Sequence, residues 1–438
     1  MQPTPPVSKA ARWVLNHQIG LSVGAVALAL LAHACLPTAR RYTSVVLLVS
    51  HYNPETQRYA IGRSDAYFLG FCIVLFTGLR ASFIKYALAP LAKRWGIFKP
   101  RDITRFSEQA WLLCYYSVFW TLGLYIYCTS KYFLNLREMF TDWPTRELPG
   151  LIKFYILGQW AFWLQQLIIV NIEERRKDHL QMVAHHLVTI LLIYTSYTLH
   201  LTRVANVILV LMDVVDIFFP LAKCLKYAGF SALRDTMFGI FMLSWFLARH
   251  VFYCITMWSI FTHMPQEISI GCYRLSHGTI TGPSPLPQGW AYMLEPFRNP
   301  TGTICYSDGI RWGFLGALGF LQLLTIIWFM LIVRVAIRVV KGLGADDIRS
   351  DDEGGEDVEI NAALESDPEA RPEDRGLDSE RKQHLLELSA GHSNCKSCTH
   401  RHGTVVTNRA ASSSGISLSK HHNRKELLGR IGCEKQVD

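Results

Sequence analysis

Four ionisable side chains stand inside two neighbouring apolar stretches of this sequence. His185 and His186 lie at the start of one stretch, and Asp213 and Asp216 lie near the end of the next. Ionisable groups inside apolar segments are costly, so a cluster of four predicts a functional site. An imidazole can accept a proton or attack an acyl carbon, and a nearby carboxylate can orient the ring and stabilise the imidazolium.

These four side chains are expected to lie in one layer. If the chain turns near Leu201, positions equidistant from the turn lie at equal depth in the two helices, which sets His186 level with Asp216 and His185 close by. Asp213 and Asp216 are three residues apart in the chain, so they fall on one helix face about one turn from each other. The layer then sits a few residues inside one face of a membrane.

The composition is that of a membrane protein with several spans. Of the 438 residues, 50% are hydrophobic and 18% are charged, and the apolar residues form long blocks. We therefore expect an all-α polytopic fold with about eight transmembrane helices, each long enough for a hydrocarbon core of about 30 Å. The expected spans are residues 20–36, 65–88, 110–128, 151–170, the two halves of 178–227, 236–262 and 310–333.

Basic residues are concentrated in short loops next to the apolar blocks. The net charge of +9 therefore reflects membrane topology, and nucleic acid is not an expected partner. By the positive-inside rule, the loops at 93–105, 175–177 and 223–234 and the C-terminal tail face the cytosol. An even number of spans puts both termini on that side, and the His and Asp layer is then close to the cytosolic face.

A metal centre is the less favoured interpretation of the histidines. Diiron lipid desaturases and hydroxylases use several His clusters, whereas His179, His185 and His186 form the only cluster in these spans. The run from Cys395 to His402 in the tail contains two Cys and two His, but it has no apolar residues that could fold around zinc. We therefore predict no metal site.

The tail, residues 342–438, is expected to be disordered and cytosolic. From Ala345 onward it is first acidic and then rich in Ser, His and Lys, without sustained apolar periodicity. Ser350 precedes three acidic residues, a context that suits an acidophilic kinase. We predict phosphorylation at Ser350.

The two apolar stretches resemble the signature of the ceramide synthases, the longevity-assurance branch of the TLC-domain family, in its fungal type. The resemblance rests on HHLVTILLIYTSYTLHLTRVANVILVLMDVVDIFFPLAKCLKY and on the upstream runs TRFSEQAW, WPTRELPGLIKFYILGQWAFWLQQ and EERRKDH, and it covers roughly Arg105 to Val333. One departure is Ala205, where relatives often carry Gly. This difference concerns close packing and touches none of the His or Asp positions.

This resemblance implies an acyl-CoA-dependent N-acyltransferase of the endoplasmic reticulum membrane. A long-chain fatty acyl group would move from coenzyme A to the amine of a sphingoid base, giving dihydroceramide or phytoceramide. Acyl-CoA is then a substrate, and no cofactor is expected. The implied partners are the two substrates, the lipid bilayer, another ceramide synthase in a homo- or heterodimer, and a small regulatory membrane subunit.

The same resemblance implies a division of the chain. Residues 1–64 hold the N-terminal region with the first span, and residues 65–104 hold the second span and a basic cytosolic loop. Residues 105–341 form the TLC catalytic domain, and residues 342–438 form the tail.

Two mechanisms are open for the implied catalytic residues, which are His185, His186, Asp213 and Asp216. In one, a His takes the proton of the attacking amine while an Asp holds the ring. In the other, a His attacks first and forms an acyl-imidazole that the amine then opens. Adjacent residues on a helix point about 100° apart, so one His is expected to react and the other to orient or relay, with His185 favoured as the nucleophile.

The only long connection on the lumenal side, residues 263–309, has Cys272 and Cys305 near its two ends. Because the lumen of the endoplasmic reticulum favours disulfides, we predict a bond between them rather than two free thiols. A non-catalytic TLC-domain lipid sensor or carrier is the alternative function, but it would not need both His and both Asp. An iron-dependent lipid hydroxylase would need further His clusters.

Overall fold

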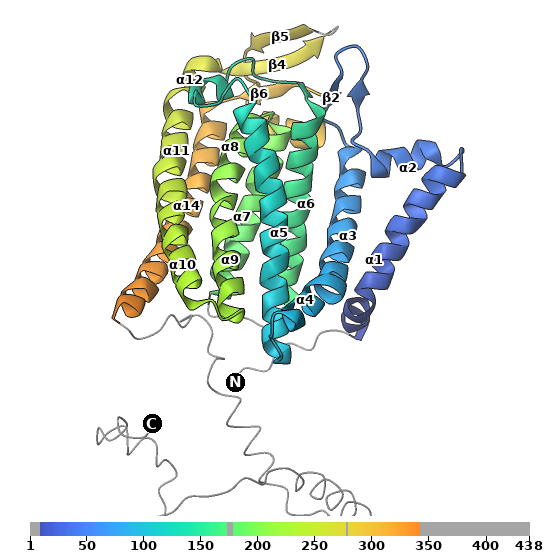
Figure 1. Ribbon diagram of the computed structural model, residues 1–438. Coiled ribbons are helices and arrows are strands. Elements are labelled where there is room, and N and C mark those ends of the chain that lie inside the picture. Colours follow the sequence, from blue (N-terminus) through green and yellow to red (C-terminus); the bar gives the residue numbers. More distant parts are fainter. Residues whose placement is uncertain (1–8, 173–177, 277–278, 342–438) are drawn as a thin grey trace, which may run out of the picture. The chain divides into compact units, whose positions relative to one another are not determined.

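Long helices run side by side in the computed structural model, which describes residues 9–172, 178–276 and 279–341 (Figure 1). Within these residues, seven helical stretches are long and apolar enough to cross a membrane. They are Asn16–Cys35, Asp65–Arg94, Pro100–Cys128, His179–Thr198, Thr202–Tyr227, Ser231–Glu267 and Asp308–Arg338. The chain is therefore a multi-pass membrane protein, as its composition predicted.

Helix α6 (Gly150–Ile172) corresponds to the fourth predicted span, and it accounts for the difference between eight predicted spans and these seven. It packs mainly against α3 (Asp65–Phe83) and α7 (His179–Thr198) and also contacts α5 (Pro100–Cys128). Lys153, Gln159 and Gln165 lower its hydropathy, and all three side chains are buried in protein. A helix surrounded by other helices can hold polar groups that lipid would leave unpaired.

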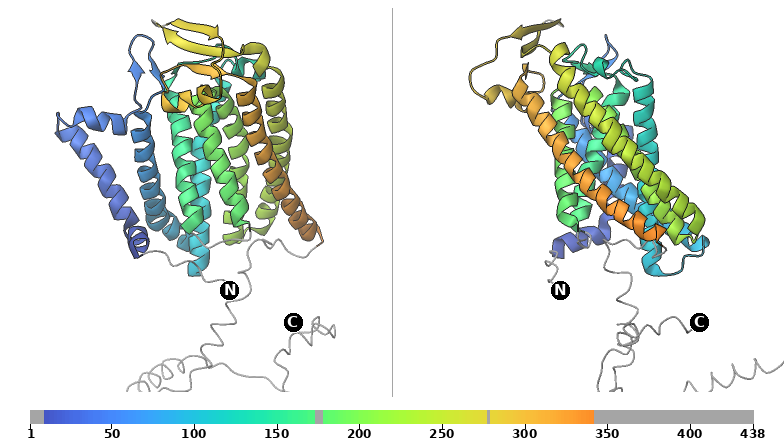
Figure 2. Two further views of the ribbon diagram at one scale, coloured as in Figure 1. Left: turned by 180° about the vertical axis from the view of Figure 1, so that it is seen from behind. Right: turned by 90° about the vertical axis from the view of Figure 1, so that its left-hand side faces the viewer.

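The remaining helices follow the predicted order of apolar blocks. Long spans are interrupted by two π-helical turns, Ile84–Leu88 and Leu247–Phe252. The other helices are α1 (Lys9–Cys35), α2 (Arg40–Leu47), α3 (Asp65–Phe83), α4 (Ala89–Arg94), α8 (Thr202–Asp213), α9 (Val215–Tyr227), α10 (Ser231–Phe246), α11 (Tyr253–Thr262), α12 (Met264–Glu267), α13 (Glu295–Arg298) and α14 (Asp308–Val340), with short 3-10 turns at Leu136–Met139 and Ala291–Met293. Figure 2 shows α14 and the α10–α11 pair inclined to the other helices.

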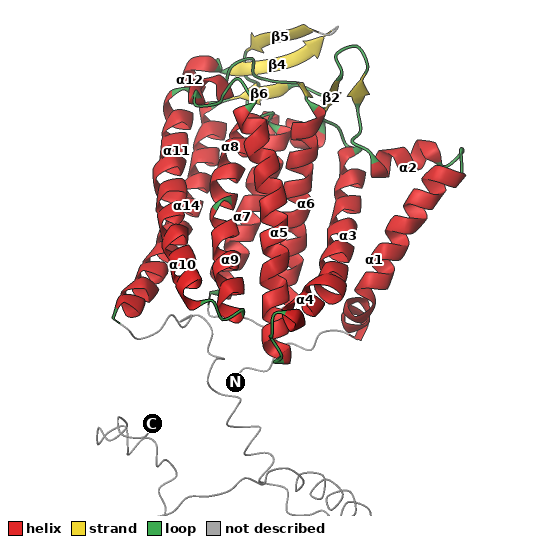
Figure 3. Ribbon diagram, viewed as in Figure 1, coloured by secondary structure: helices red, strands yellow, loops and turns green. Residues whose placement is uncertain are grey.

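All six short strands gather at one end of the helices, which we call the strand end (Figure 3). One antiparallel sheet joins β1 (Tyr52–Asn53), β2 (Arg58–Ala60) and β3 (Glu147–Leu148) in that order. A second has the order β5 (Thr279–Ser284), β4 (Gly271–Ser276) and β6 (Ile304–Tyr306). These sheets were not predicted, because the strands are short and lie within connections rich in Gly and Pro.

The two cysteines expected to pair, Cys272 and Cys305, are joined by a disulfide in the structure. They are direct partners across the pairing of β4 with β6, so the bond links two strands that already share backbone hydrogen bonds. Both residues are buried. The bond therefore ties the long connection between α11 and α14 into the strand end.

The opposite end of the helices, which we call the basic end, carries the Lys- and Arg-rich turns. It includes the α4–α5 connection, the turn from α9 to α10 and the last turn of α14. The chain leaves α9 at Gly229, whose φ of +82° suits glycine. The amide N of Phe230 then bonds the carbonyl O of Leu225, and the helix ends in a Schellman-type cap.

A buried ion pair holds α3, α6 and α7 together near the strand end. Lys153 Nζ lies 2.7 Å from Asp65 Oδ1, and both side chains are at most 4% exposed. The same ammonium donates to the carbonyl oxygens of Ser50 and Ala60, while Tyr197 donates its hydroxyl to Asp65 Oδ2. The ammonium therefore has one charged and two backbone partners, all inside the protein.

Candidate active site

The two adjacent histidines of α7 have different surroundings. His186 is buried, and its Nδ1 lies 2.6 Å from the carbonyl O of Met182, one helical turn earlier. His185 is half-buried, and its Nδ1 has no hydrogen-bond partner among the described residues. The His185 ring packs edge-on against Trp163 and Trp328, with ring centroids 5.4 and 5.3 Å away. His185 is thus held by packing between two indole rings, and its Nδ1 makes no hydrogen bond within the described residues.

The acids lie on either side of an irregular turn between α8 and α9. Pro220 in α9 has no backbone N–H and cannot bond the carbonyl of Asp216 one turn earlier. The regular helix is interrupted at Val214, between the two acids. Next to this interruption, the carbonyl O of Met212 accepts a hydrogen bond from Arg249 at 2.8 Å.

Arg249 comes from the π-helical turn between α10 and α11, and its guanidinium is the partner of Asp216. Its Nη2 lies 2.9 Å from Asp216 Oδ2, and its side chain is 6% exposed. The guanidinium also stacks on Trp245, 4.2 Å from the ring centroid. A π-helical turn places one extra residue in a helix and is frequent at functional sites. Sequence reasoning missed Arg249, although the same cost of a charge inside an apolar span marks it.

Asp213 is fully buried and does not line the cavity. Gln159 of α6 donates its amide to Asp213 Oδ2, and Tyr115 of α5 donates its hydroxyl to Gln159 Oε1 at 3.1 Å. Gln159 is one helical turn from Trp163, which contacts both histidine rings. Asp213 therefore fixes α6 against α8 at the level of the histidines.

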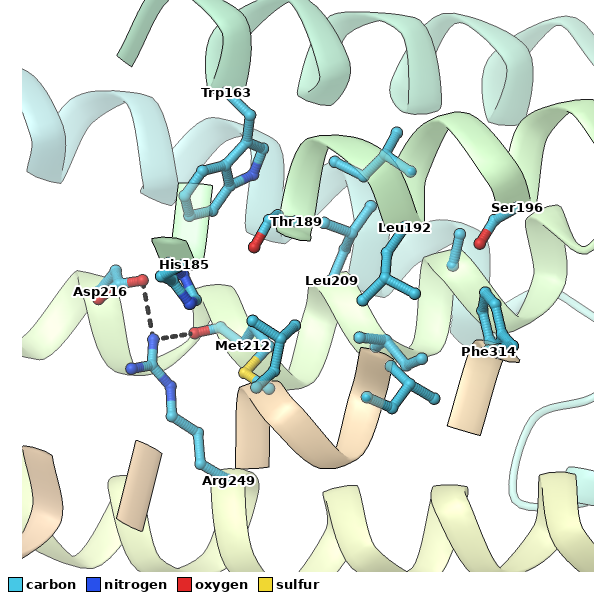
Figure 4. A pocket seen from close by; sticks show the side chains of 15 residues that line it. Trp163, His185, Thr189, Leu192, Ser196, Leu209, Met212, Asp216, Arg249 and Phe314 are labelled. Carbon is cyan, nitrogen blue, oxygen red and sulfur yellow. Dashed lines mark hydrogen bonds and ion pairs between the residues drawn. The ribbon is translucent and has the colours of Figure 1, made fainter. Parts of the chain in front are cut away.

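A narrow cavity begins at His185, Asp216 and Arg249 and continues between α7, α8 and α14 (Figure 4). The volume open to the centre of a water-sized sphere is about 40 Å³, so the cavity is a narrow slot. Apart from the three groups at its start, the lining is almost entirely apolar: Trp163, Thr189, Leu192, Ile193, Ser196, Ala205, Ile208, Leu209, Met212, Phe314, Leu318 and Leu321. The arrangement offers one reactive layer joined to one hydrocarbon-lined slot.

The structure brings together only part of the predicted layer. His185 shares the cavity with Asp216, whereas His186 and Asp213 are not part of its lining. The two acids have different partners, which are Gln159 of α6 for Asp213 and Arg249 for Asp216, and they still lie close enough for their charges to interact. Sequence reasoning also missed Trp163 and Gln159 as contacts of these residues.

Other predicted sites have simpler outcomes. Ser350 and the Cys395–His402 run lie outside the described residues. Within residues 9–172, 178–276 and 279–341, no group of three or more His, Cys, Asp or Glu side chains is placed to hold a metal ion.

Comparisons with known proteins agree on one family. The TLC-domain family model matches residues 105–334. A protein of Gibberella moniliformis named ceramide synthase is 46% identical over 328 residues, which cover 75% of this chain and 77% of the relative. A sphingosine N-acyltransferase-like protein of Alternaria alternata is 43% identical, over 80% of this chain and 78% of its own. A sphingosine N-acyltransferase of Schizosaccharomyces pombe is 38% identical, over 80% and 83%.

Proposed function

The chain belongs to the TLC-domain family and, within it, to the ceramide synthases, and from this premise we propose that His185 is the residue that receives the acyl group. The enzyme is an N-acyltransferase that moves a fatty acyl group from acyl-CoA to the amine of a sphingoid base. The observation that carries the proposal is the position of His185, with an unpaired ring nitrogen at the polar start of the apolar slot.

The slot suits the hydrocarbon chain of the acyl donor. An acyl chain with its carbonyl at His185 would extend between Leu192, Leu209 and Leu318 toward the strand end. Burial of apolar surface contributes roughly 25 cal/mol per Å², so this lining supplies binding energy along the whole chain. The thioester is then held at the one place in the slot where ionisable groups meet.

In the first step, a ring nitrogen of His185 attacks the thioester carbonyl carbon. A C–N bond forms, the C–S bond breaks, and coenzyme A leaves as a thiolate that takes up the ring proton. The guanidinium of Arg249 stands beside the same space and stabilises the negative charge that develops on the carbonyl oxygen.

In the second step, the amine of the sphingoid base attacks the acyl carbon. The base arrives as an ammonium, and Asp216 accepts its extra proton, since this carboxylate lines the cavity and its side chain is 26% exposed. The bond from the acyl carbon to the ring breaks, and the second amine proton returns to the imidazole. The products are ceramide and regenerated His185, so acyl-CoA is a substrate and no cofactor takes part.

We place the basic end of the helices in the cytosol and the strand end in the lumen of the endoplasmic reticulum. Coenzyme A is anionic and water-soluble, so it suits the end that carries the Lys- and Arg-rich turns. His185 is the seventh residue of α7, whose first residue lies at that end. The Cys272–Cys305 bond at the other end suits an oxidising compartment. Both termini are then cytosolic.

Two predictions concern protein partners of the enzyme. We expect a homo- or heterodimer with another ceramide synthase, and we expect association with a small regulatory membrane subunit.

The experiment that tests the proposal is to incubate the purified protein with acyl-CoA alone and to measure its intact mass. We expect one acyl adduct per chain and a burst of free coenzyme A before any base is added. His185→Ala should abolish both the adduct and ceramide formation. His186→Ala is the matched control, because the neighbouring ring lies outside the cavity, and it should retain the adduct at a reduced rate.

Two results would count against the proposal. Wild-type protein that forms ceramide without a burst of coenzyme A or an adduct would favour general-base catalysis instead. An adduct that persists in His185→Ala would move the nucleophile to another residue.

A further inference from the structure

The slot that begins at His185 has a second end, formed by Ser196, Ala205 and Phe314. All three residues line the cavity, and each is at most 6% exposed. In Figure 4 Ser196 and Phe314 lie at the side of the slot opposite to His185, Asp216 and Arg249. The slot therefore has one polar end and one apolar end.

Each of three helices contributes one face to this slot, which sets its length. On α7 the lining positions run from His185 to Ser196, and on α8 and α9 they run back from Asp216 to Ala205. At a rise of 1.5 Å per residue, the distance from His185 to Ser196 along α7 is about 16 Å. The slot thus spans roughly half of a hydrocarbon core of about 30 Å.

The apolar end is blocked by well-packed side chains. Phe314 belongs to the buried cluster that contains Leu201 and Tyr306, and these two are at most 3% exposed. Ala205 is buried on α8 and belongs to a second cluster, with Ile193 and Tyr197 of α7. A chain that reaches this end can go further only if one of these side chains becomes smaller.

We propose that Ala205 and Phe314 determine the longest acyl chain that the enzyme accepts. The inference rests on the proposed function, because it takes the occupant of the slot to be the acyl chain bound through its carbonyl end at His185. Each methylene that the slot can bury favours binding by roughly fourfold, the equivalent of about 0.8 kcal/mol, and each methylene beyond the blocked end gains nothing and must displace packed side chains.

Ala205 is the sensitive position of the two. Its side chain is a single methyl group, so Gly removes one carbon from the end wall and a larger residue fills part of the slot. Its neighbours on the cavity side, Ile208 and Leu209, keep the wall otherwise unchanged. Ala205 is therefore a position where a single methyl group changes the length of the slot.

The test is a competition among acyl-CoAs of increasing length at a fixed, saturating sphingoid base, with the ceramides measured by mass spectrometry. Phe314→Ala and Ala205→Gly should shift the product distribution to longer acyl chains, by roughly fourfold in relative kcat/KM for each additional methylene that becomes buried. Ala205→Leu should shift it to shorter chains. Opposite shifts from one end wall cannot both arise from loss of folded protein.

The matched control is Phe320→Ala, which removes the same side chain from the same helix. Phe320 is 41% exposed and is not part of the cavity lining, so this variant should keep the wild-type distribution. A second series varies the length of the base at a fixed acyl-CoA. Selectivity for the base should not change in any of these variants.

Unchanged acyl selectivity in Phe314→Ala and Ala205→Leu, with ceramide still formed, would overturn this inference and leave the role of His185 intact. A shift in base selectivity instead would assign the slot to the other substrate. If wild-type protein forms no acyl adduct, the proposed function fails, whatever the acyl selectivity of the variants.

Discussion

Two buried ion pairs connect helices in the described part of the chain, and they differ in their hydrogen-bond partners and in their access to the cavity. In the pair near the strand end, Lys153 contacts Asp65 Oδ1 and donates to two backbone carbonyls, and Asp65 Oδ2 accepts from Tyr197 and from the backbone of Gly62. In the pair nearer the basic end, Arg249 binds Asp216 and a backbone carbonyl, but its Nε has no partner among the described residues.

The second difference is access. The Lys153 and Asp65 side chains are closed off by protein, whereas 26% of the Asp216 side chain is exposed and faces the same cavity as His185. A pair that is closed off by protein can only hold helices in place. A pair beside a cavity can still interact with a substrate, so access to the cavity marks the reactive layer.

The largest effect on stability is expected when the closed pair is broken. Lys153→Met leaves the Asp65 carboxylate buried without a counter-charge, which typically costs about 3–5 kcal/mol of folding free energy. Thermal unfolding in detergent should show a large drop, and the yield of folded protein should fall. The ceramide-forming activity of the protein that remains folded should be close to wild type.

The double variant Asp65→Asn with Lys153→Met is the control for that experiment. It removes both charges, so it should recover most of the lost stability. Two results would contradict this role of the pair. Lys153→Met would unfold at the wild-type temperature, or the double variant would be no more stable than Lys153→Met.

A smaller effect on stability and a larger one on turnover are expected at Arg249. Arg249→Met leaves Asp216 without its partner, but this carboxylate keeps contact with the cavity and can be solvated there. We expect a modest loss of stability and a fall in turnover on the order of 10²-fold, because the carboxylate is no longer held in position. Steady-state kinetics and thermal unfolding measure the two effects separately.

Arg249→Lys sharpens the same comparison. It keeps the charge but loses the planar fork that binds Asp216 and the Met212 carbonyl together, so its turnover should fall between those of wild type and Arg249→Met. If Arg249→Met lost as much stability as Lys153→Met and kept its turnover, the Arg249 pair would have only a structural role, like the Lys153 pair.

The smallest effect is expected at the strand end, as a pH dependence of stability. His200 lies in the turn between α7 and α8, where burial, with the positive charge of Arg146 as a second cause, lowers its pKa from 6.5 to about 3. Between these two values only the unfolded chain binds the proton, so stability is complete above pH 6.5 and decreases as the pH falls toward 3. Thermal unfolding between pH 7 and pH 4.5 measures this decrease.

His200→Asn is the matched variant for the pH series. The residue has a φ of +55°, which Asn tolerates, and an amide can replace the hydrogen bond from Nδ1 to the carbonyl O of Thr145. The decrease in stability below pH 6.5 should become smaller, with no change in the pH profile of ceramide formation. If the stability of His200→Asn decreases as much below pH 6.5 as that of wild type, other groups cause the decrease.

The positions of the helices could be predicted from the sequence because long apolar blocks report membrane spans directly. The predicted second span, residues 65–88, coincides with α3 and the π-helical turn after it. The predicted fourth span, residues 151–170, coincides with α6, although the polar residues that face other helices lower its hydropathy. The short strands carry no comparable signal.

The candidate site was predictable only in part. Ionisable residues inside spans identified His185 and Asp216, and the same criterion applied to α10 and α11 would have found Arg249. The interruption at Val214 could not be placed from the sequence, because Pro220 alone does not say where the helix regains its regular hydrogen bonds.

The order in which the ribosome makes the chain treats the two ion pairs differently. In both pairs the acid is made first, since Lys153 follows Asp65 by 88 residues and Arg249 follows Asp216 by 33 residues. The two pairs differ in when they can be completed, because Arg249 follows Lys153 by 249 − 153 = 96 residues. At a synthesis rate of roughly 5–20 residues per second, this is a delay on the order of 10 seconds. The scaffold is thus complete before the reactive layer, which is assembled only when α10 and α11 join the helices already in place.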